Sequence, residues 1–196
     1  MGLGSSRTAW VYAGSVGRGF EPAQRQLLTV SATVLGHQED GRAHRQRLGL
    51  QARYYLPQST RWLFFAGTSA NLLRNPNPAD ALALGGDNGP RGYPLRYLSG
   101  TRRSLFTLEE RYCKDLFPLR LFRVGAAAFV EVGRAWGGDA AGSGNAGWLR
   151  NAGLGLRFFS VRTAFTNVLH VDLTLPFDPG TKAEKVQLLV KTRASV

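Results

Sequence analysis

Apolar and polar residues alternate along most of this chain, with the two-residue period that is typical of β-strands. The clearest segment is 122–132, where Phe122, Val124, Ala126, Ala128, Val130 and Val132 share one face and Arg123, Gly125, Ala127, Phe129 and Glu131 share the other. Ordinary strands have roughly five or six residues, whereas a tilted strand needs about nine to eleven to cross a bilayer. This segment therefore predicts a strand long enough to span a membrane, with one wholly apolar face.

The same alternation recurs and predicts about nine strands in a single antiparallel, up-and-down sheet. They are expected near residues 6–14, 25–36, 44–56, 61–73, 103–114, 119–134, 150–161, 166–177 and 186–196. Short turns are expected at Asp40-Gly41, Pro57-Gln58 and Pro179-Gly180, and longer connections at 74–101 and 136–147. The helical period of 3.6 residues is nearly absent, so the fold class is all-β, and no linker divides residues 1–196.

The placement of charges bears on the kind of partner. Net charge is +12, from 25 Lys and Arg against 13 Asp and Glu, and such a balance favours an anionic partner: nucleic acid, phosphate or a lipid headgroup. The charged residues of the strands fall on the mixed faces, as at Arg47, Arg53, Arg123, Arg157, Glu131, Asp172, Lys191 and Arg193. A soluble barrel would bury its apolar faces, whereas a membrane barrel would turn them toward lipid and enclose a wet lumen. Long strands, with Trp10, Tyr12, Tyr54, Trp62 and Tyr112 near strand ends, favour the membrane barrel.

Residues that carry catalysis or bind metals are sparse. Cys113 is the single cysteine, and the three histidines are scattered, so no zinc-binding spacing exists. No serine-hydrolase elbow or zinc-peptidase helix motif is present. His170 and Asp172 lie two residues apart on one strand with no nucleophile identified, and polar residues of a lumen explain them better. We therefore expect no enzyme, no cofactor and no metal site.

The most distinctive segment is Gly-Gly-Asp-Asn-Gly-Pro-Arg-Gly-Tyr-Pro at 85–94, where glycines permit an unusual backbone from which Arg91 projects. It resembles the Arg-Gly-aromatic loop of the BamA-like family of bacterial outer-membrane barrels. Four later segments resemble that family's strands in the family's order: Leu108-Glu109-Glu110-Arg111-Tyr112, 128–133, 153–158 and 170–176. The resemblance covers about 85–196, and five strands follow the loop in both; residues 6–73 match only as hairpins of suitable length.

The resemblance implies a site inside the barrel. In the family this loop folds back into the lumen, which gives Gly86, Arg91, Gly92 and Tyr93 the role of a lumen loop. Glu131 is then the wall partner of Arg91, and Glu109 is a second candidate. Arg111, Phe129 and Gly133 are expected on the same wall. Glu131 stands where family members usually have Asp, although its longer side chain still permits a bidentate pair with arginine.

The resemblance also implies a function. The chain would be the C-terminal portion of a sixteen-stranded transmembrane barrel in the cell outer membrane, with its N-terminal strands and the family's periplasmic domains missing. It would take part in the insertion of outer-membrane proteins or in polypeptide export. Its partners would be outer-membrane lipid, client polypeptides and other subunits of an assembly complex, with no nucleic acid. The chain ends at Val196, where family members end in an aromatic residue.

Two alternatives stay open at this point. One is a soluble basic β-barrel that binds nucleic acid or another anionic ligand, which the net charge of +12 favours. The other is a porin-like barrel with no role in assembly. The loop at 85–94 and the order of the strands after it favour the assembly family over the porin.

Overall fold

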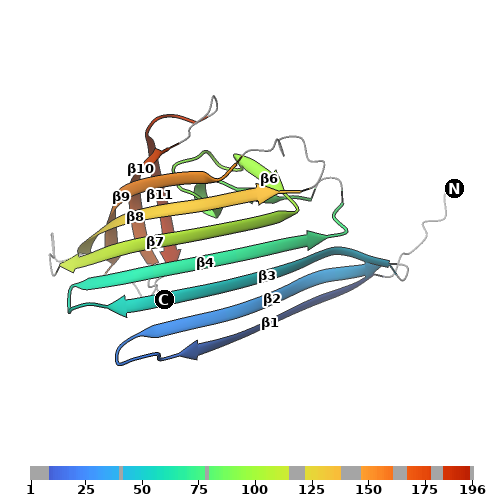
Figure 1. Cartoon of the computed structure of the whole chain (residues 1–196), viewed down its shortest axis with the longest axis horizontal. Helices are drawn as coiled ribbons and strands as arrows, with labels where there is room; N and C mark the ends of the chain where they lie inside the picture. The colour runs from blue at the N-terminus through green and yellow to red at the C-terminus, as the bar shows by residue number, and fades with distance from the viewer. Residues whose placement is uncertain are drawn as a thin grey trace.

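The computed structural model describes residues 9–39, 42–77, 80–114, 122–137, 147–160, 167–177 and 183–194. Nine long strands form one antiparallel sheet in which every strand pairs with its neighbours in the sequence (Figure 1). They are β1 (Ala9–Phe20), β2 (Leu27–Glu39), β3 (Arg42–Pro57), β4 (Trp62–Arg74), β7 (Arg102–Lys114), β8 (Phe122–Trp136), β9 (Leu149–Ser160), β10 (Asn167–Pro176) and β11 (Gln187–Ala194). The expected all-β class and up-and-down order are confirmed.

The strand boundaries agree with the alternation except at the start of the chain. The first strand was expected near 6–14, but β1 continues to Phe20 and pairs along its whole length with β2. Glycines at 14, 17 and 19 interrupt the alternation of apolar residues, so the alternation does not predict the part of the strand after residue 14. The turn expected at Pro57-Gln58 lies between β3 and β4, whereas those expected at Asp40-Gly41 and Pro179-Gly180, and most of the connection at 136–147, lie outside the described residues.

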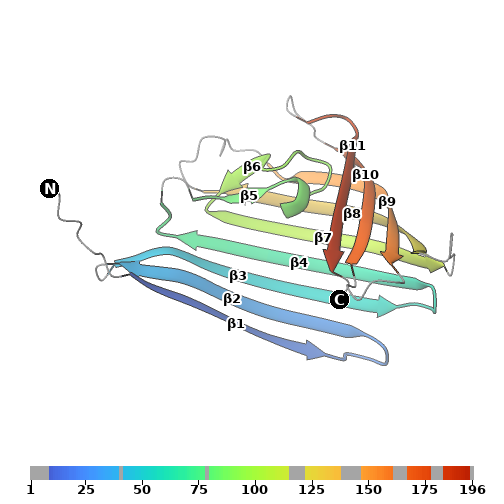
Figure 2. The same ribbon diagram turned by 180° about the vertical axis from the view of Figure 1, so that it is seen from behind.

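The connection after β4 contains structure that the alternation does not predict. Two three-residue strands, β5 (Leu82–Leu84) and β6 (Leu98–Gly100), pair with each other and form a second, small sheet. Between them lies one turn of 3-10 helix, η1 (Gly86–Asn88). We call residues 82–100 the inner loop, because they lie on the concave side of the large sheet (Figure 2).

The large sheet curls strongly but is not closed into a barrel. Among the residues that the structure describes, the end strands β1 and β11 pair only with β2 and β10, respectively. The strands β9, β10 and β11 turn back toward the side on which the inner loop lies (Figures 1 and 2). Closure would require further strands between the two edges, so these nine strands form an open, partial barrel wall.

The two faces of the sheet differ in chemistry and in exposure. On β8, β9 and β10 the polar, glycine-containing faces point to the concave side and are mostly buried, whereas the apolar faces point outward. Large apolar side chains remain exposed on the outward face, including Leu154 at 67% and Leu188 at 68%. The arrangement is the reverse of a soluble sandwich, in which the apolar faces are buried against each other.

The apolar core is small and lies between the inner loop and the sheet. Its buried members are Leu84, Tyr93, Leu98, Ala135 and Leu149. Leu84, Tyr93 and Leu98 belong to the inner loop, and Ala135 and Leu149 to β8 and β9, so this cluster fixes the loop at one end of the concave face. No helix in the described part of the chain is long and apolar enough to cross a membrane.

Candidate functional site

The backbone of the inner loop is shaped by glycines that hold Arg91 toward the sheet. Gly85 and Gly86 have φ angles of 125° and 56°, which side chains with a Cβ rarely adopt. The amide of Gly86 donates to the carbonyl of Tyr93 at 2.9 Å, and the amide of Tyr93 donates to the carbonyl of Pro90 at 3.2 Å. These two bonds close a compact turn around Arg91, so its side chain starts from an ordered backbone.

Arg91 lies at the centre of three carboxylates that come from three different strands. Its Nε donates to Glu131 Oε1 at 2.8 Å, Nη1 donates to Asp172 Oδ2 at 2.9 Å, and Nη2 donates to Glu109 Oε2 at 2.8 Å. The backbone amide of Arg91 also donates to Glu131 Oε2 at 2.8 Å. Only 3% of the arginine is exposed, and the three acids are equally enclosed. We call these four residues the arginine clamp.

Other polar groups complete the electrostatic balance around the arginine clamp. Arg157 donates to Asp172 and, at 3.3 Å, to Glu109 Oε1, and Arg111 donates to the same Glu109 oxygen at 2.9 Å. Asn151 Nδ2 donates to Glu131 Oε2 at 3.2 Å. Three arginines therefore face three carboxylates, so the buried cluster is formally neutral. Buried ions are tolerated only when paired and hydrogen-bonded in this way.

The surroundings act on the protonation of Arg91 in opposing directions. Burial in the loop–sheet interface lowers the pKa of Arg91, because the charged form loses its hydration. The negative charges of Glu131, Glu109 and Asp172 more than reverse this effect and raise the pKa above its usual range. The guanidinium therefore stays charged around neutral pH, as arginine does elsewhere in proteins.

An aromatic ring and a glycine allow the loop to approach the sheet closely. The guanidinium carbon of Arg91 lies 3.5 Å from the centre of the Phe129 ring, a cation–π contact on the inward face of β8. A Cβ added at Gly92 would lie 2.8 Å from Asn151 Cβ, so only glycine fits there. At Gly133 an added Cβ would meet the ring of Pro90 at 3.1 Å, which also favours glycine.

Tyr93 provides a second attachment of the loop. Its side chain is fully buried, its hydroxyl donates to the carbonyl of Arg150 at 3.0 Å, and its ring packs against Tyr97 with centroids 5.1 Å apart. On the other side of Arg91, Thr174 Oγ1 donates to the carbonyl of Arg91 at 3.3 Å. The loop is therefore held to β9 and β10 as well as to β7 and β8.

The structure brings together the residues that the sequence singled out. Arg91 contacts Glu131, Glu109 and Phe129, while Gly86, Gly92, Tyr93 and Gly133 shape or attach the loop. Arg111 reaches Glu109 and stacks on Phe65 rather than contacting Arg91.

Sequence reasoning did not identify Asp172 or Arg157 as members of the cluster. Their inward positions were readable from the alternation. Their meeting depends on the register that places Asp172 opposite Gly155, where no side chain intervenes.

The arrangement of the arginine clamp is suited to holding the inner loop against the sheet. Each of its carboxylates accepts hydrogen bonds from at least one arginine. Within the described ranges, no group of three or more His, Cys, Asp or Glu is placed to hold a metal ion.

A scan against protein-family models found no match for this chain, and a search of curated proteins found no similar sequence.

Proposed function

We propose that this chain is the C-terminal wall of a BamA-like outer-membrane β-barrel, whose outward face contacts lipid. The observation that carries the proposal is the outward face itself, where long rows of Leu, Val and Phe are exposed on neighbouring strands. A contiguous apolar surface of this kind is rare on a soluble protein and marks contact with lipid or with another protein. The soluble alternative needs these side chains inside, so their exposure argues against it.

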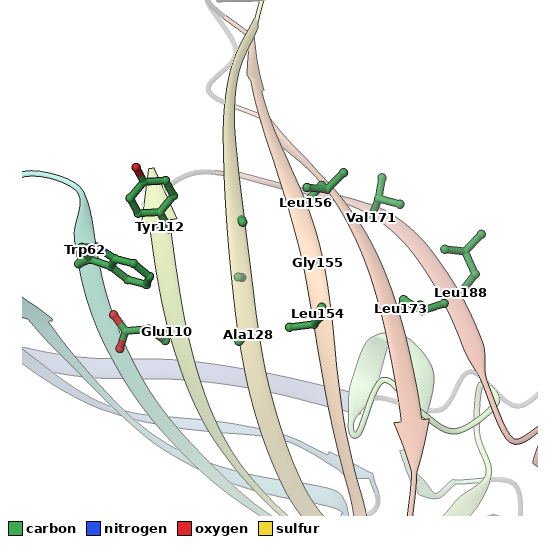
Figure 3. Close-up of a pocket in the computed structure, with 12 residues that line it drawn as sticks. Trp62, Glu110, Tyr112, Ala128, Leu154, Gly155, Leu156, Val171, Leu173 and Leu188 are labelled. Carbon is green, nitrogen blue, oxygen red and sulfur yellow. The ribbon is translucent and has the colours of Figure 1, made fainter. Parts of the chain in front are cut away.

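The outward surface has the features expected for contact with a bilayer. A shallow apolar groove runs from Trp62 and Tyr112 across β8 to the leucines of β9, β10 and β11 (Figure 3). Ala126 and Ala128 form its floor because their side chains are short. Trp and Tyr at the end of an apolar band resemble the interfacial aromatic girdles of membrane barrels. Among the described residues that line this groove, Glu110 is the acidic one, and it lies next to the aromatic pair.

The arginine clamp has a conformational role in this proposal. It attaches the inner loop to three strands, β7, β8 and β10, and so keeps the wall curved and the lumen occupied at one end. In the parent barrel, β1 would pair with the further strands that closure requires, whereas the outer edge of β11 would lie at the seam, where its backbone groups can add a strand from a client polypeptide. The parent protein would insert outer-membrane proteins or export a polypeptide by such strand addition, with no nucleotide or cofactor.

The test is extraction from membranes of a bacterium that expresses the chain with its natural upstream sequence. The proposal expects the protein in the outer-membrane fraction, resistant to high salt and alkaline carbonate and released only by detergent. Release by salt alone, together with salt-dependent retention on nucleic acid, would support the soluble basic barrel instead. Assembly activity would be measured as the outer-membrane level of other barrels after depletion of this protein.

A further inference from the structure

Four arginines lie on the outward face at the end of the sheet that carries the inner loop. They are Arg74 at the end of β4, Arg102 at the start of β7, Arg134 near the end of β8 and Arg150 near the start of β9. Their neighbours Leu73, Gly133, Ala135, Leu149 and Asn151 are buried on the concave side, so strand alternation directs the four arginines outward. We call them the arginine row. It is distinct from the buried arginine clamp.

The register of the sheet makes the row continuous. Leu72 is opposite Arg102, Ser104 is opposite Arg134, and Val132 is opposite Arg150. Each arginine is therefore the diagonal neighbour of the next, at a spacing of about 7–8 Å. The four positive charges thus form a continuous diagonal line across four adjacent strands.

On the strands that carry the row, no acidic side chain of the described residues lies beside it. Among the outward positions of the described parts of β4, β7, β8 and β9, the only acidic residue is Glu110, which lies toward the other end of β7. Arg74, Arg102 and Arg150 are exposed, and Arg134 is half-buried with its guanidinium 5.9 Å from the Trp136 ring. Like charges at this spacing repel each other, so an anionic group that approaches the row relieves this repulsion.

The row also borders the apolar surface, at the level where the hydrocarbon core of a bilayer would meet the headgroup region. Along β8 the outward residues change from Ala128 and Val130 to Arg134 and Trp136, and along β9 from Leu156 and Leu154 to Arg150. Trp148, which is 46% exposed, lies just beyond Arg150. Arginine and tryptophan next to an apolar band are the residues that meet headgroups at a membrane interface.

We propose that the arginine row binds the phosphate groups of anionic lipid headgroups in the leaflet that faces the inner-loop end of the sheet. Guanidinium groups donate paired hydrogen bonds to phosphate oxygens, and a row of them can engage several headgroups or one headgroup with several phosphates. This inference rests on the proposed membrane location and adds to it a lipid class and an orientation. In the described parts of these strands, the end that carries Glu110 has no corresponding row.

Quenching of tryptophan fluorescence by brominated lipids tests the inference. The full chain, with Trp10 and Trp62 replaced by Phe, keeps Trp136 and Trp148 near the row as reporters. It would be placed in lipid nanodiscs that contain brominated phosphatidic acid or brominated phosphatidylcholine in a background of unlabelled phosphatidylcholine. We expect stronger quenching by the brominated phosphatidic acid at equal mole fraction. The ratio of the two quenching affinities gives the preference for the anionic lipid.

Two double variants provide the comparison. Arg102→Gln with Arg150→Gln removes two exposed charges of the row, and we expect the anionic preference to fall at least about fivefold. Arg47→Gln with Arg53→Gln removes the same charge from the concave face of β3, and we expect the preference to stay within about twofold of the parent, because these side chains do not reach the lipid. Circular dichroism checks that strand content is equal in all three proteins.

The outcomes separate the two proposals. A chain that inserts into the nanodiscs but has no anionic preference, or whose two double variants lose it equally, overturns the arginine row as a lipid site and leaves the membrane proposal intact. A chain whose tryptophans are not quenched by either brominated lipid has no lipid contact, and both proposals then fail.

Discussion

Replacing Arg91 with alanine should release the inner loop while leaving the large sheet in place. The substitution removes three buried ion pairs, each with nitrogen–oxygen distances of 2.8–2.9 Å. It also leaves three carboxylates facing two remaining arginines, Arg111 and Arg157. Removing one partner from a buried ion pair typically costs about 3–5 kcal/mol. Because Arg157 and Asn151 still bind the acids, we expect the whole cluster to lose about that amount and not three times as much.

Limited proteolysis measures the release of the loop. Chymotrypsin can cut after Tyr97, but Leu98 is 5% exposed in the attached loop, so cleavage requires the loop to open. A loss of about 3–5 kcal/mol raises the open population by at least about a hundredfold, and the cleavage rate follows that population when opening is fast. The assay uses full-length protein in a non-ionic detergent, with circular dichroism as the measure of strand content.

Arg111→Ala is the matched control for this experiment. Arg111 also binds Glu109, at 2.9 Å, but its side chain is 29% exposed and makes no contact with the loop among the described residues. An ion pair of that exposure contributes about 1 kcal/mol or less, so the cleavage rate should change less than about tenfold. Equal protection of Arg91→Ala and the parent, or equal sensitivity of the two variants, would refute the reasoning that the clamp attaches the loop.

Three further substitutions test separate parts of the account. Gly92→Ala places a Cβ 2.8 Å from Asn151 Cβ and should open the loop in the same protease assay, even though every charge is kept. Glu131→Gln removes the acid that binds both the side chain and the backbone amide of Arg91, and should cost about 2–4 kcal/mol in the urea-unfolding free energy measured in vesicles. Leu173→Arg places a charge on the outward face and should cost about 2–4 kcal/mol in the same measurement, whereas Ser69→Arg on the concave face should change it by less than about 1 kcal/mol.

The alternation of apolar and polar residues was sufficient to predict the long strands, because the residues within each strand show which of its faces is apolar. It predicted nine long strands in an up-and-down order, and residues 123–132 have the faces that the sequence assigned to them. It failed at β1, where glycines break the pattern before Phe20. It also missed β5 and β6, which are only three residues each and are held by the sheet rather than by their own periodicity.

The site was only partly readable from the sequence, because its members are brought together by register. Glu131 and Glu109 were expected near Arg91 on the basis of the family resemblance. Asp172 lies 81 residues from Arg91, and only the pairing of β9 with β10 and the curl of the sheet bring its carboxylate to the guanidinium. Alternation predicts the face of the sheet on which a residue lies, but not which residues of other strands lie beside it. The structure was therefore needed to place Asp172 and Arg157 in the cluster around Arg91.

The most direct test of the central claim is a comparison of lipid and water contact on the two faces of the sheet. Single cysteines in a Cys113→Ser background would carry a nitroxide spin label at Leu154 or Leu173 on the outward face, and at Gln51 or Ser69 on the concave face. In lipid vesicles, the account predicts that the outward labels relax with dissolved oxygen and are shielded from an aqueous nickel chelate, and that the concave labels show the reverse. Outward labels that meet the nickel chelate as readily as the concave ones would contradict the claim that this apolar face lies against lipid.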